Sequence, residues 1–246
     1  MLTNKNAIIT GSSHGIGREI LTMFAKNHAN VWCLVRRVDP EFQEYINNLQ
    51  ETFQVWIKPV FVDLEDRVSI KKAISTVQAD KLPIDILVNN AGINYHGTFL
   101  MTPIDEMERL FQVNYYAPIQ LIQLTAKRMI RQRSGVIINI GSVSGFEHNT
   151  GNFAYSATKA TLMWATQTIS RELAPYNIRV NGIAPGVTET TINAGNEDVL
   201  QSTVIPRMNI KRYGLPEEIA KAVLFMASNE SSFISGQVLR VDGGRF

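Results

Sequence analysis

The sequence contains a single cysteine, Cys33, among its 246 residues. One cysteine excludes a disulfide framework within the chain. Because Cys33 lies in the apolar run Val31–Val35, we expect it to fill the core rather than act as a nucleophile. Histidine is also scarce: the four histidines are scattered without the spacing of metal ligands, so no metal site is expected.

A strong charge of one sign is absent as well. The formal net charge is +2 and no block rich in lysine or arginine occurs, so neither nucleic acid nor an anionic membrane surface is expected as a partner. No apolar run is long enough to cross a bilayer, and no signal or transit peptide precedes the first predicted strand. We therefore expect a soluble, cytoplasmic protein.

The composition that remains is globular, with 45% hydrophobic residues and a length that fits one domain over residues 1–246. Short apolar runs alternate with stretches that carry apolar residues at helical spacing. Strands are predicted at Ala7–Thr10, Val31–Val35, Val55–Val62, Ile84–Val88, Gly135–Gly141, Ile178–Ile183 and Gln237–Val241. Helices are predicted at Ile16–Asn27, at Pro40–Gln50, after the expected N-cap Asp66, at Pro103–Arg131 with a break near Pro118, at Tyr155–Leu173 and at Pro216–Ser228.

Repeated strand–helix units with continuously apolar strands predict a parallel sheet covered by helices on both faces. Right-handed crossovers then make the fold a doubly wound α/β sheet, in which ligands bind at the carboxyl ends of the strands. The segment 188–213 has no clear period. We expect it to be irregular and mobile and to act as a lid over a substrate.

The first strand-to-helix junction, Ala7–Ile20, is rich in glycine. A strand is followed at once by Gly11, Gly15 and Gly17, and then by a helical pattern. Gly11 allows a tight turn, Gly15 lets the backbone approach phosphates, and Gly17 lets the helix pack against the strand. The free N–H groups of the helix then face an anion, so this junction predicts a pyrophosphate site.

Tyr155 and Lys159 are four residues apart on a predicted helix, so that the phenol and the ammonium group can point the same way. A neighbouring Lys⁺ stabilises a phenolate and lowers the tyrosine pKa, which makes a better acid for a developing alkoxide. Ser142, after the fifth strand, can hydrogen-bond the same oxygen. Taken alone, a tyrosine and a lysine at this spacing are more often an exposed helix pair with no role.

Taken together, these motifs resemble the short-chain dehydrogenases/reductases along essentially the whole chain. The pattern TGxxxGxG occurs at Thr10–Gly17 and NNAG at Asn89–Gly92. A Ser–Tyr–Lys set occurs at Ser142, Tyr155 and Lys159, at the family's common spacing. Other matches are Asn114, the Pro185–Gly186 pair, Thr188 and Thr190.

The resemblance implies a Rossmann-type fold and hydride transfer between a nicotinamide and a carbonyl or carbinol carbon. It implies that Tyr155 is the acid/base, that Lys159 lowers its pKa and holds the nicotinamide ribose, and that Ser142 orients the substrate oxygen. Asn114 would hold a water in a proton relay to Lys159. The implied cofactor-binding residues are Gly11, Ser13, His14, Gly15, Ile16, Gly17, Arg36, Arg37, Asp63, Leu64, Asn90, Ala91, Gly92, Tyr155, Lys159, Pro185, Gly186, Val187, Thr188 and Thr190.

The end of the second strand favours NADP(H) over NAD(H). An acidic residue there would bind the ribose 2′-hydroxyl and repel a 2′-phosphate. This chain instead has Val35 followed by Arg36 and Arg37, whose guanidinium groups can bind a phosphate and stack on adenine. The alternative is that both arginines only end a strand in solvent. Many NADP-using relatives also carry a basic residue in the glycine loop, where this chain has His14.

Among the family, the sequence is most similar to 3-oxoacyl-[acyl-carrier-protein] reductases. The similar stretches are Ile140–Gly145, Ser170–Leu173 and Ser235–Gly244. Arg128 and Arg171 fall near positions where those reductases carry arginines that face the acidic carrier protein, and exposed arginines would steer such a partner. The alternative is that the two arginines are ordinary surface charges.

Other residues favour a dehydrogenase of sugars, polyols or other secondary alcohols. The carrier-protein branch often has glutamine where this chain has Asn152, and Glu147 and His148 could hydrogen-bond a hydroxylated substrate. The alternative is that Glu147 and His148 only form a polar loop at the rim of the cleft. The expected substrate contacts are therefore Ser142, Glu147, His148 and Asn152. A third reading, a protein that binds NADP without catalysis, is disfavoured because the full set of catalytic residues is present.

The family is usually tetrameric, so a homotetramer is expected. A helical interface could be formed by apolar residues of two predicted helices, although a helix core would have the same pattern. These residues are Leu121, Ile122, Leu162, Met163 and Trp164.

Overall fold

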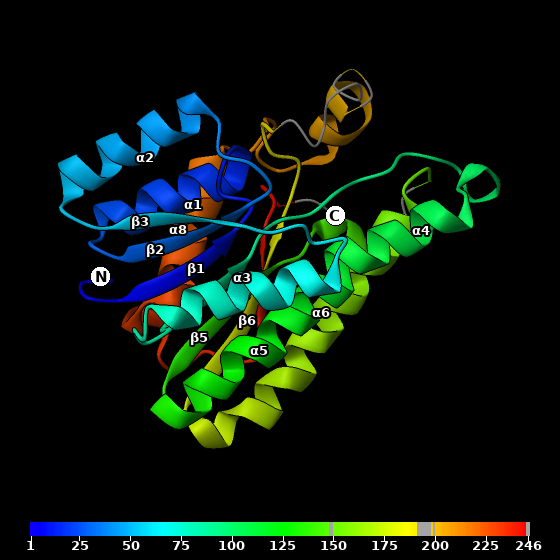
Figure 1. Ribbon diagram of the computed structural model, residues 1–246. Coiled ribbons are helices and arrows are strands. Elements are labelled where there is room, and N and C mark those ends of the chain that lie inside the picture. The colour runs from blue at the N-terminus through cyan, green and yellow to red at the C-terminus, as the bar shows by residue number, and fades with distance from the viewer. Residues whose placement is uncertain (148–149, 191–197, 199, 245–246) are drawn as a thin grey trace.

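A computed structural model describes all residues except 148–149, 191–197, 199 and 245–246. Seven parallel strands form one sheet in the order β3-β2-β1-β4-β5-β6-β7. Helices cover both faces of this sheet (Figure 1), which confirms the predicted Rossmann-type doubly wound fold. The strands are β1 (Asn6–Thr10), β2 (Asn30–Val35), β3 (Ile57–Phe61), β4 (Ile86–Asn89), β5 (Gly135–Ile140), β6 (Ile178–Pro185) and β7 (Val238–Val241).

The two faces of the sheet are buried by different helices, because successive side chains of a strand point to opposite faces. Ile9 of β1 packs in the core beneath α1 (Gly15–Lys26), α2 (Pro40–Phe53) and α8 (Pro216–Ala227). The neighbouring Ile8 packs in a second core beneath α3 (Arg67–Ala79) and α5 (Ala117–Gln132). Burial on both faces explains why the strands are continuously apolar rather than alternating.

The predicted helix starts are confirmed where a capping residue marks them. The Asp66 side chain accepts a hydrogen bond from the Val68 N–H and caps α3. Asp39 caps α2 in the same way, with Pro40 in the first turn. Pro216 likewise opens α8.

The long helical region predicted at Pro103–Arg131 is interrupted. It consists of α4 (Ile104–Phe111), a π-helical turn at Gln112–Tyr116, and α5. The interruption lies just before Pro118, which sits in the first turn of α5. Such single π turns are frequent at functional sites, and this one contains Asn114.

Two further expectations need correction. The third strand begins at Ile57 rather than Val55. Of the residues predicted to form a helical interface, Leu121, Ile122, Leu162 and Met163 are buried within the chain itself. Only Trp164, on α6 (Phe153–Leu173), is exposed, at 65%. The apolar side chains of these helices pack into the core of their own chain. A helix that packed against another subunit would show the same sequence pattern.

The segment predicted as an irregular lid is described only in part, since 191–197 and 199 lie outside the described residues. Its described part contains a π-helical turn at Leu200–Val204 and a 3-10 turn at Ile205–Arg207. Throughout the described part of the chain, no helix is both long and apolar enough to cross a membrane.

Candidate active site

A cavity of about 1640 Å³ runs along the carboxyl-terminal edge of the sheet. Its walls come from the segments that follow β1, β2, β3, β4, β5 and β6, so the predicted motifs are brought together although they are far apart in the sequence. Every residue predicted to bind the dinucleotide lines this cavity, as do Ser142 and Asn152. Asn114 lies outside the lining, and His148 lies outside the described residues.

The glycine turn between β1 and α1 leaves no room for a side chain at Gly11 or Gly17. Gly11 has a φ of +66°, in the left-handed region. A Cβ added at Gly17 would lie 2.0 Å from the Gly11 carbonyl oxygen and 2.5 Å from Asn90 Nδ2. The N-terminus of α1 opens into the cavity and has no acidic residue in its first turn. This cradle fits the pyrophosphate of a dinucleotide.

The NNAG segment after β4 is bonded to the glycine turn. Thr10 Oγ1 accepts hydrogen bonds from the backbone N–H groups of Asn90 and Ala91, both at 2.9 Å. Asn90 Nδ2 donates to the carbonyl oxygens of Thr10 and Gly11 at 3.0 and 3.2 Å. The Asn90 amide therefore holds the glycine turn in shape at the cavity wall.

Asn114 joins the end of β4 to α6 through its side chain. Its Oδ1 accepts from the Ile93 N–H at 2.9 Å, and its Nδ2 donates to the Ile93 carbonyl at 2.9 Å and to Thr158 Oγ1 at 3.1 Å. Thr158 Oγ1 in turn donates to the Tyr155 carbonyl at 2.7 Å. Asn114 is 1% exposed. Its amide hydrogens are both used, so its side chain positions the helix that carries Tyr155.

Tyr155 and Lys159 are both buried on α6, with Lys159 Nζ 5.7 Å from the centroid of the Tyr155 ring. Lys159 Nζ donates to the Ile140 carbonyl at 2.9 Å. Burial lowers the pKa of Lys159 to about 8. Burial also raises the pKa of Tyr155 to about 12, and a hydrogen bond with Ser142 lowers it in part. The pKa of Tyr155 is therefore raised in this structure and not lowered as predicted, because removal from water outweighs the hydrogen bond with Ser142.

Three guanidinium groups line the end of the cavity near β2 and β3. Arg18 Nη1 lies 3.0 Å from Glu41 Oε1, and its guanidinium lies 4.0 Å above the Tyr45 ring. Arg37 Nε lies 3.9 Å from Asp39 Oδ2. Among the residues that the structure describes, Arg36 has no carboxylate within salt-bridge distance.

The predicted substrate contacts are only partly brought together. Ser142 and Asn152 line the cavity, and Asn152 Oδ1 is buried without a hydrogen-bond partner in the described part of the chain. Glu147 is not part of the lining. Its Oε1 lies 3.6 Å from Nη2 of Arg240, which also pairs with Asp242.

Arg128 and Arg171 lie far from the cavity. Arg171 lies in the last turn of α6 and Arg128 lies just before the last turn of α5, and these helices lead towards the starts of β6 and β5. Those helix ends form the lower edge of the molecule in Figure 1, opposite the carboxyl ends of the strands. The predicted contact of these two arginines with a carrier protein stays a prediction, and within one chain neither lines the cavity.

Several lining residues carry no motif that sequence reasoning could use. Most come from loops and turns, and Arg18 and Glu41 come from the first turns of α1 and α2, where neither periodicity nor a known spacing marks a binding position. They include Arg18, Asp39, Glu41, Glu65, Asn94, His96, Ser144, Thr150, Leu200, Thr203, Val204 and Arg207.

The chain is similar to known proteins along most of its length. A family model described as short chain dehydrogenase matches residues 5–200. A 3-oxoacyl-[acyl-carrier-protein] reductase of Thermotoga maritima is 35% identical over 243 residues, which cover 99% of this chain and 98% of the relative. A 3alpha-hydroxysteroid dehydrogenase of Mediterraneibacter gnavus is 34% identical over 244 residues, covering 99% and 97%. The crystal structure of a gluconate 5-dehydrogenase from Burkholderia cenocepacia, in complex with NADP and tartrate, has a TM-score of 0.92 and 31% identity, covering 98% and 95%.

Proposed function

Because the chain belongs to the short-chain dehydrogenase family and is an NAD(P)-dependent oxidoreductase, we propose that it reduces a ketone to a secondary alcohol with NADPH. A 3-oxoacyl group on acyl carrier protein is the first candidate substrate. The observation that carries this proposal is the placement of Ser142, Tyr155 and Lys159 in the same cavity as the glycine turn.

The protein's own residues supply a proton and orient the carbonyl group. The hydride is the chemistry that a bound nicotinamide dinucleotide contributes. Tyr155 stays protonated at neutral pH because burial raises its pKa to about 12, so its hydroxyl can donate a proton to the carbonyl oxygen. The Ser142 hydroxyl can hydrogen-bond the same oxygen and hold it against Tyr155. The product is a secondary alcohol, and Tyr155 must then recover a proton.

Lys159 and Asn114 support the proton donor in different ways. Lys159 Nζ can donate to a ribose hydroxyl and exchange protons near pH 8, given its lowered pKa. Asn114 bonds to Thr158 in α6 and to Ile93 in the segment after β4, so its side chain ties the start of α6 to that segment. Because its amide hydrogens are already used, a relay water would be held by another atom, such as the Asn114 backbone carbonyl.

The preference for NADPH is supported by charge. Arg36 and Arg37 follow β2 and line the cavity, and both are exposed. A guanidinium group binds a 2′-phosphate through paired, charge-assisted hydrogen bonds. The gluconate 5-dehydrogenase of similar fold is described in complex with NADP.

The acyl-carrier-protein substrate is supported by several relatives described as 3-oxoacyl-[acyl-carrier-protein] reductases. A second candidate is the oxidation or reduction of hydroxylated small molecules. It is favoured by Asn152 Oδ1 in the cavity wall, which has no hydrogen-bond partner among the described residues, and by the similar gluconate and hydroxysteroid dehydrogenases. Arg128 and Arg171 do not line the cavity of their own chain. A carrier protein that contacts them would therefore have to present its substrate to the cavity of another copy of the chain.

A homotetramer is part of the proposal. Trp164 and Phe153 on α6 are 65% and 48% exposed, and Leu100 and Met101 are 89% and 73% exposed. Exposed apolar side chains of this size are typical of subunit contacts. The cytoplasmic location remains a prediction of the sequence.

Replacement of Tyr155 by phenylalanine tests the proposed role. We expect Tyr155→Phe to reduce ketone turnover by at least about 100-fold, because it removes only the proton donor. Dinucleotide affinity, measured by fluorescence titration, should stay within about 3-fold. Turnover close to wild type would overturn the catalytic assignment.

A further inference from the structure

The two halves of the cavity differ in charge. All four described acidic residues of the lining, Asp39, Glu41, Asp63 and Glu65, lie on segments that follow β2 and β3. The half that contains Ser142 and Tyr155 is walled by segments after β4, β5 and β6 and by the turns at 200–207. No described residue of that half carries a carboxylate, whereas Lys159 and Arg207 are both present.

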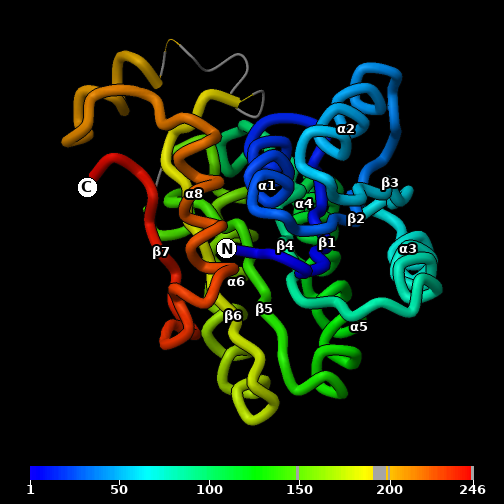
Figure 2. The backbone as a smooth tube through the Cα atoms, turned by 90° about the vertical axis from the view of Figure 1, so that its left-hand side faces the viewer, coloured from blue at the N-terminus to red at the C-terminus, as the bar shows by residue number. Residues whose placement is uncertain are grey.

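Arg207 lies on the catalytic half because its segment is fastened to the chain after β7. The Asn209 and Ile210 N–H groups donate to the carbonyl oxygens of Gly244 and Gly243 at 3.3 and 2.9 Å. Met208 is 4% exposed and packs on Gly243. In Figure 2 this segment lies beside β7 and the C-terminus, on the side of the molecule away from α2 and β3. Arg207 is therefore separated from the arginines at the β2 end.

Arg207 has no hydrogen bond or ion pair among the residues that the structure describes. The neighbouring Arg212 is different, because its Nη1 and Nη2 each lie 2.8 Å from a Glu218 carboxylate oxygen. Lys159 is also engaged, through Ile140. Among the described residues of this half, Arg207 is thus the cation that is available to a ligand. A guanidinium group binds carboxylate and phosphate in a forked geometry.

We propose that the substrate carries an anionic group, a carboxylate or a phosphate, which Arg207 binds while the ketone lies at Ser142 and Tyr155. The inference rests on the proposed reductase function and adds the chemical class of the substrate. Asn152 and the hydrogen-bonded pair Asn94 and His96 line the same half and provide neutral polar contacts beside the charge. The anion could be the carboxylate of a free keto acid or the phosphate of a carrier's phosphopantetheine arm.

The test compares three ketones with the same reacting group and different charge. They are a neutral acetoacetyl thioester of N-acetylcysteamine, free acetoacetate, and the acetoacetyl thioester of phosphopantetheine. Arg207→Ala should lower kcat/KM about 10- to 100-fold for an anionic ketone, mainly through KM, and leave the neutral thioester within about 2-fold. Arg207→Lys should recover part of the loss. Lys211→Ala, an exposed neighbour outside the cavity lining, is the matched control and should change nothing.

A binding measurement tests the role of Arg207 without depending on turnover. By calorimetry, 3-hydroxybutyrate or free phosphopantetheine should bind the wild type more tightly than Arg207→Ala by the same factor, and the difference should shrink in high salt. An effect confined to the keto acid would identify a free acid, and one confined to the phosphate-bearing thioester a carrier arm. Equal effects on neutral and anionic ketones, no effect, or a loss of NADPH affinity would overturn the inference. Failure of the wild type to reduce any ketone would instead overturn the proposed function.

Discussion

Lys159 Nζ lies 5.7 Å from the centroid of the Tyr155 ring and donates to the Ile140 carbonyl, not to the phenol oxygen. Burial moves the two groups in opposite directions, lowering the pKa of Lys159 to about 8 and raising that of Tyr155 to about 12. Both shifts favour the neutral form of the side chain. In this state Tyr155 therefore holds its proton, and the phenol becomes a stronger acid only when a neighbouring positive charge stabilises its phenolate.

The lowered pKa of Lys159 predicts a dependence of stability on pH. The folded protein loses this proton near pH 8, whereas an unfolded lysine keeps it to about pH 10.4. Between these values the unfolded state binds more protons, so the lysine's penalty is full below pH 8 and fades as the pH rises to about 10.

Lys159→Met should accordingly raise the free energy of unfolding at pH 7 by about 1–3 kcal/mol, after the lost hydrogen bond to Ile140 is allowed for. Urea denaturation of both proteins from pH 7 to 10 checks this, and the gain should disappear near pH 10. A difference that is constant with pH would show that charge burial is not its cause. Turnover should be lost throughout.

Gly17→Ala should damage the dinucleotide cradle. Its new Cβ would lie 2.0 Å from the Gly11 carbonyl oxygen, and backbone would have to move. We expect a loss of about 1–3 kcal/mol in stability and at least about 10-fold weaker dinucleotide binding. The control is Gly214→Ala, whose Cβ meets nothing closer than 3.6 Å. Wild-type binding by Gly17→Ala would contradict the assignment of this turn.

Arg36 should contribute most of the preference for NADPH, since its charge faces no carboxylate in the described structure. Arg36→Ala should weaken NADPH binding about 10- to 100-fold and NADH binding by less than about 3-fold. Equilibrium titration with both dinucleotides measures this. An equal loss for the two would mean that Arg36 does not contact a 2′-phosphate.

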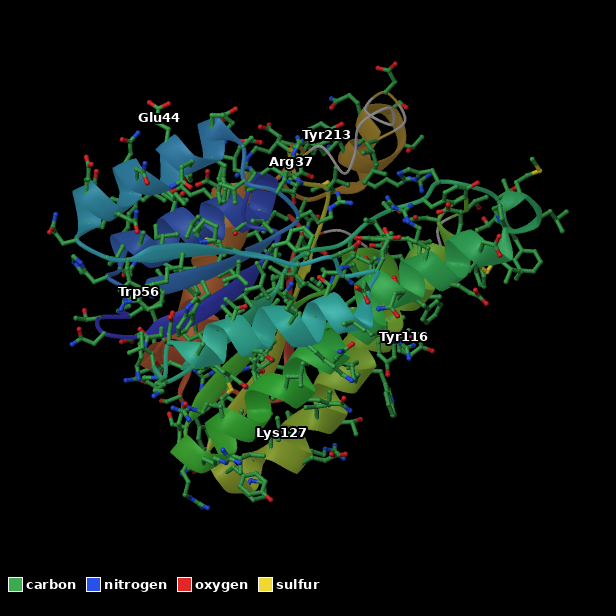
Figure 3. All side chains as sticks on the ribbon, in the orientation of Figure 1. Arg37, Glu44, Trp56, Tyr116, Lys127 and Tyr213 are labelled. Atoms are coloured by element: carbon green, nitrogen blue, oxygen red, sulfur yellow. The ribbon has the colours of Figure 1, made fainter. Side chains whose placement is uncertain are left out.

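Glu41 should oppose the 2′-phosphate, because it lines the cavity and pairs with Arg18. Glu41→Gln should tighten binding of NADPH about 2- to 10-fold by removing a repelling charge, with little change for NADH. Glu44→Gln is the control on the same helix. Figure 3 shows Glu44 on the outer side of α2, and Glu44 is not part of the cavity lining. Equal responses of the two variants would exclude a local charge effect.

Sequence reasoning succeeded where chemistry demands particular residues at particular strand ends. The glycine turn, the NNAG segment and the Ser–Tyr–Lys set all fall in one cavity because parallel strands place their carboxyl ends at one edge. It failed for Leu121 and Met163, whose apolar faces cover the core, since core and interface have the same pattern. It also missed the direction of the Tyr155 pKa, which depends on burial. Arg207 lies in a short turn that no motif marks.

The most direct measurement follows the loss of NADPH by absorbance when the enzyme is mixed with an acetoacetyl thioester, with NADH in a parallel assay. We predict rapid oxidation of NADPH by the wild type and a rate at least about 10-fold lower with NADH. The Tyr155→Phe variant should not oxidise NADPH in this assay. Tight binding of NADPH without turnover would rule out the acyl substrate and favour hydroxylated substrates. Faster oxidation of NADH than of NADPH would contradict the role given to Arg36 and Arg37.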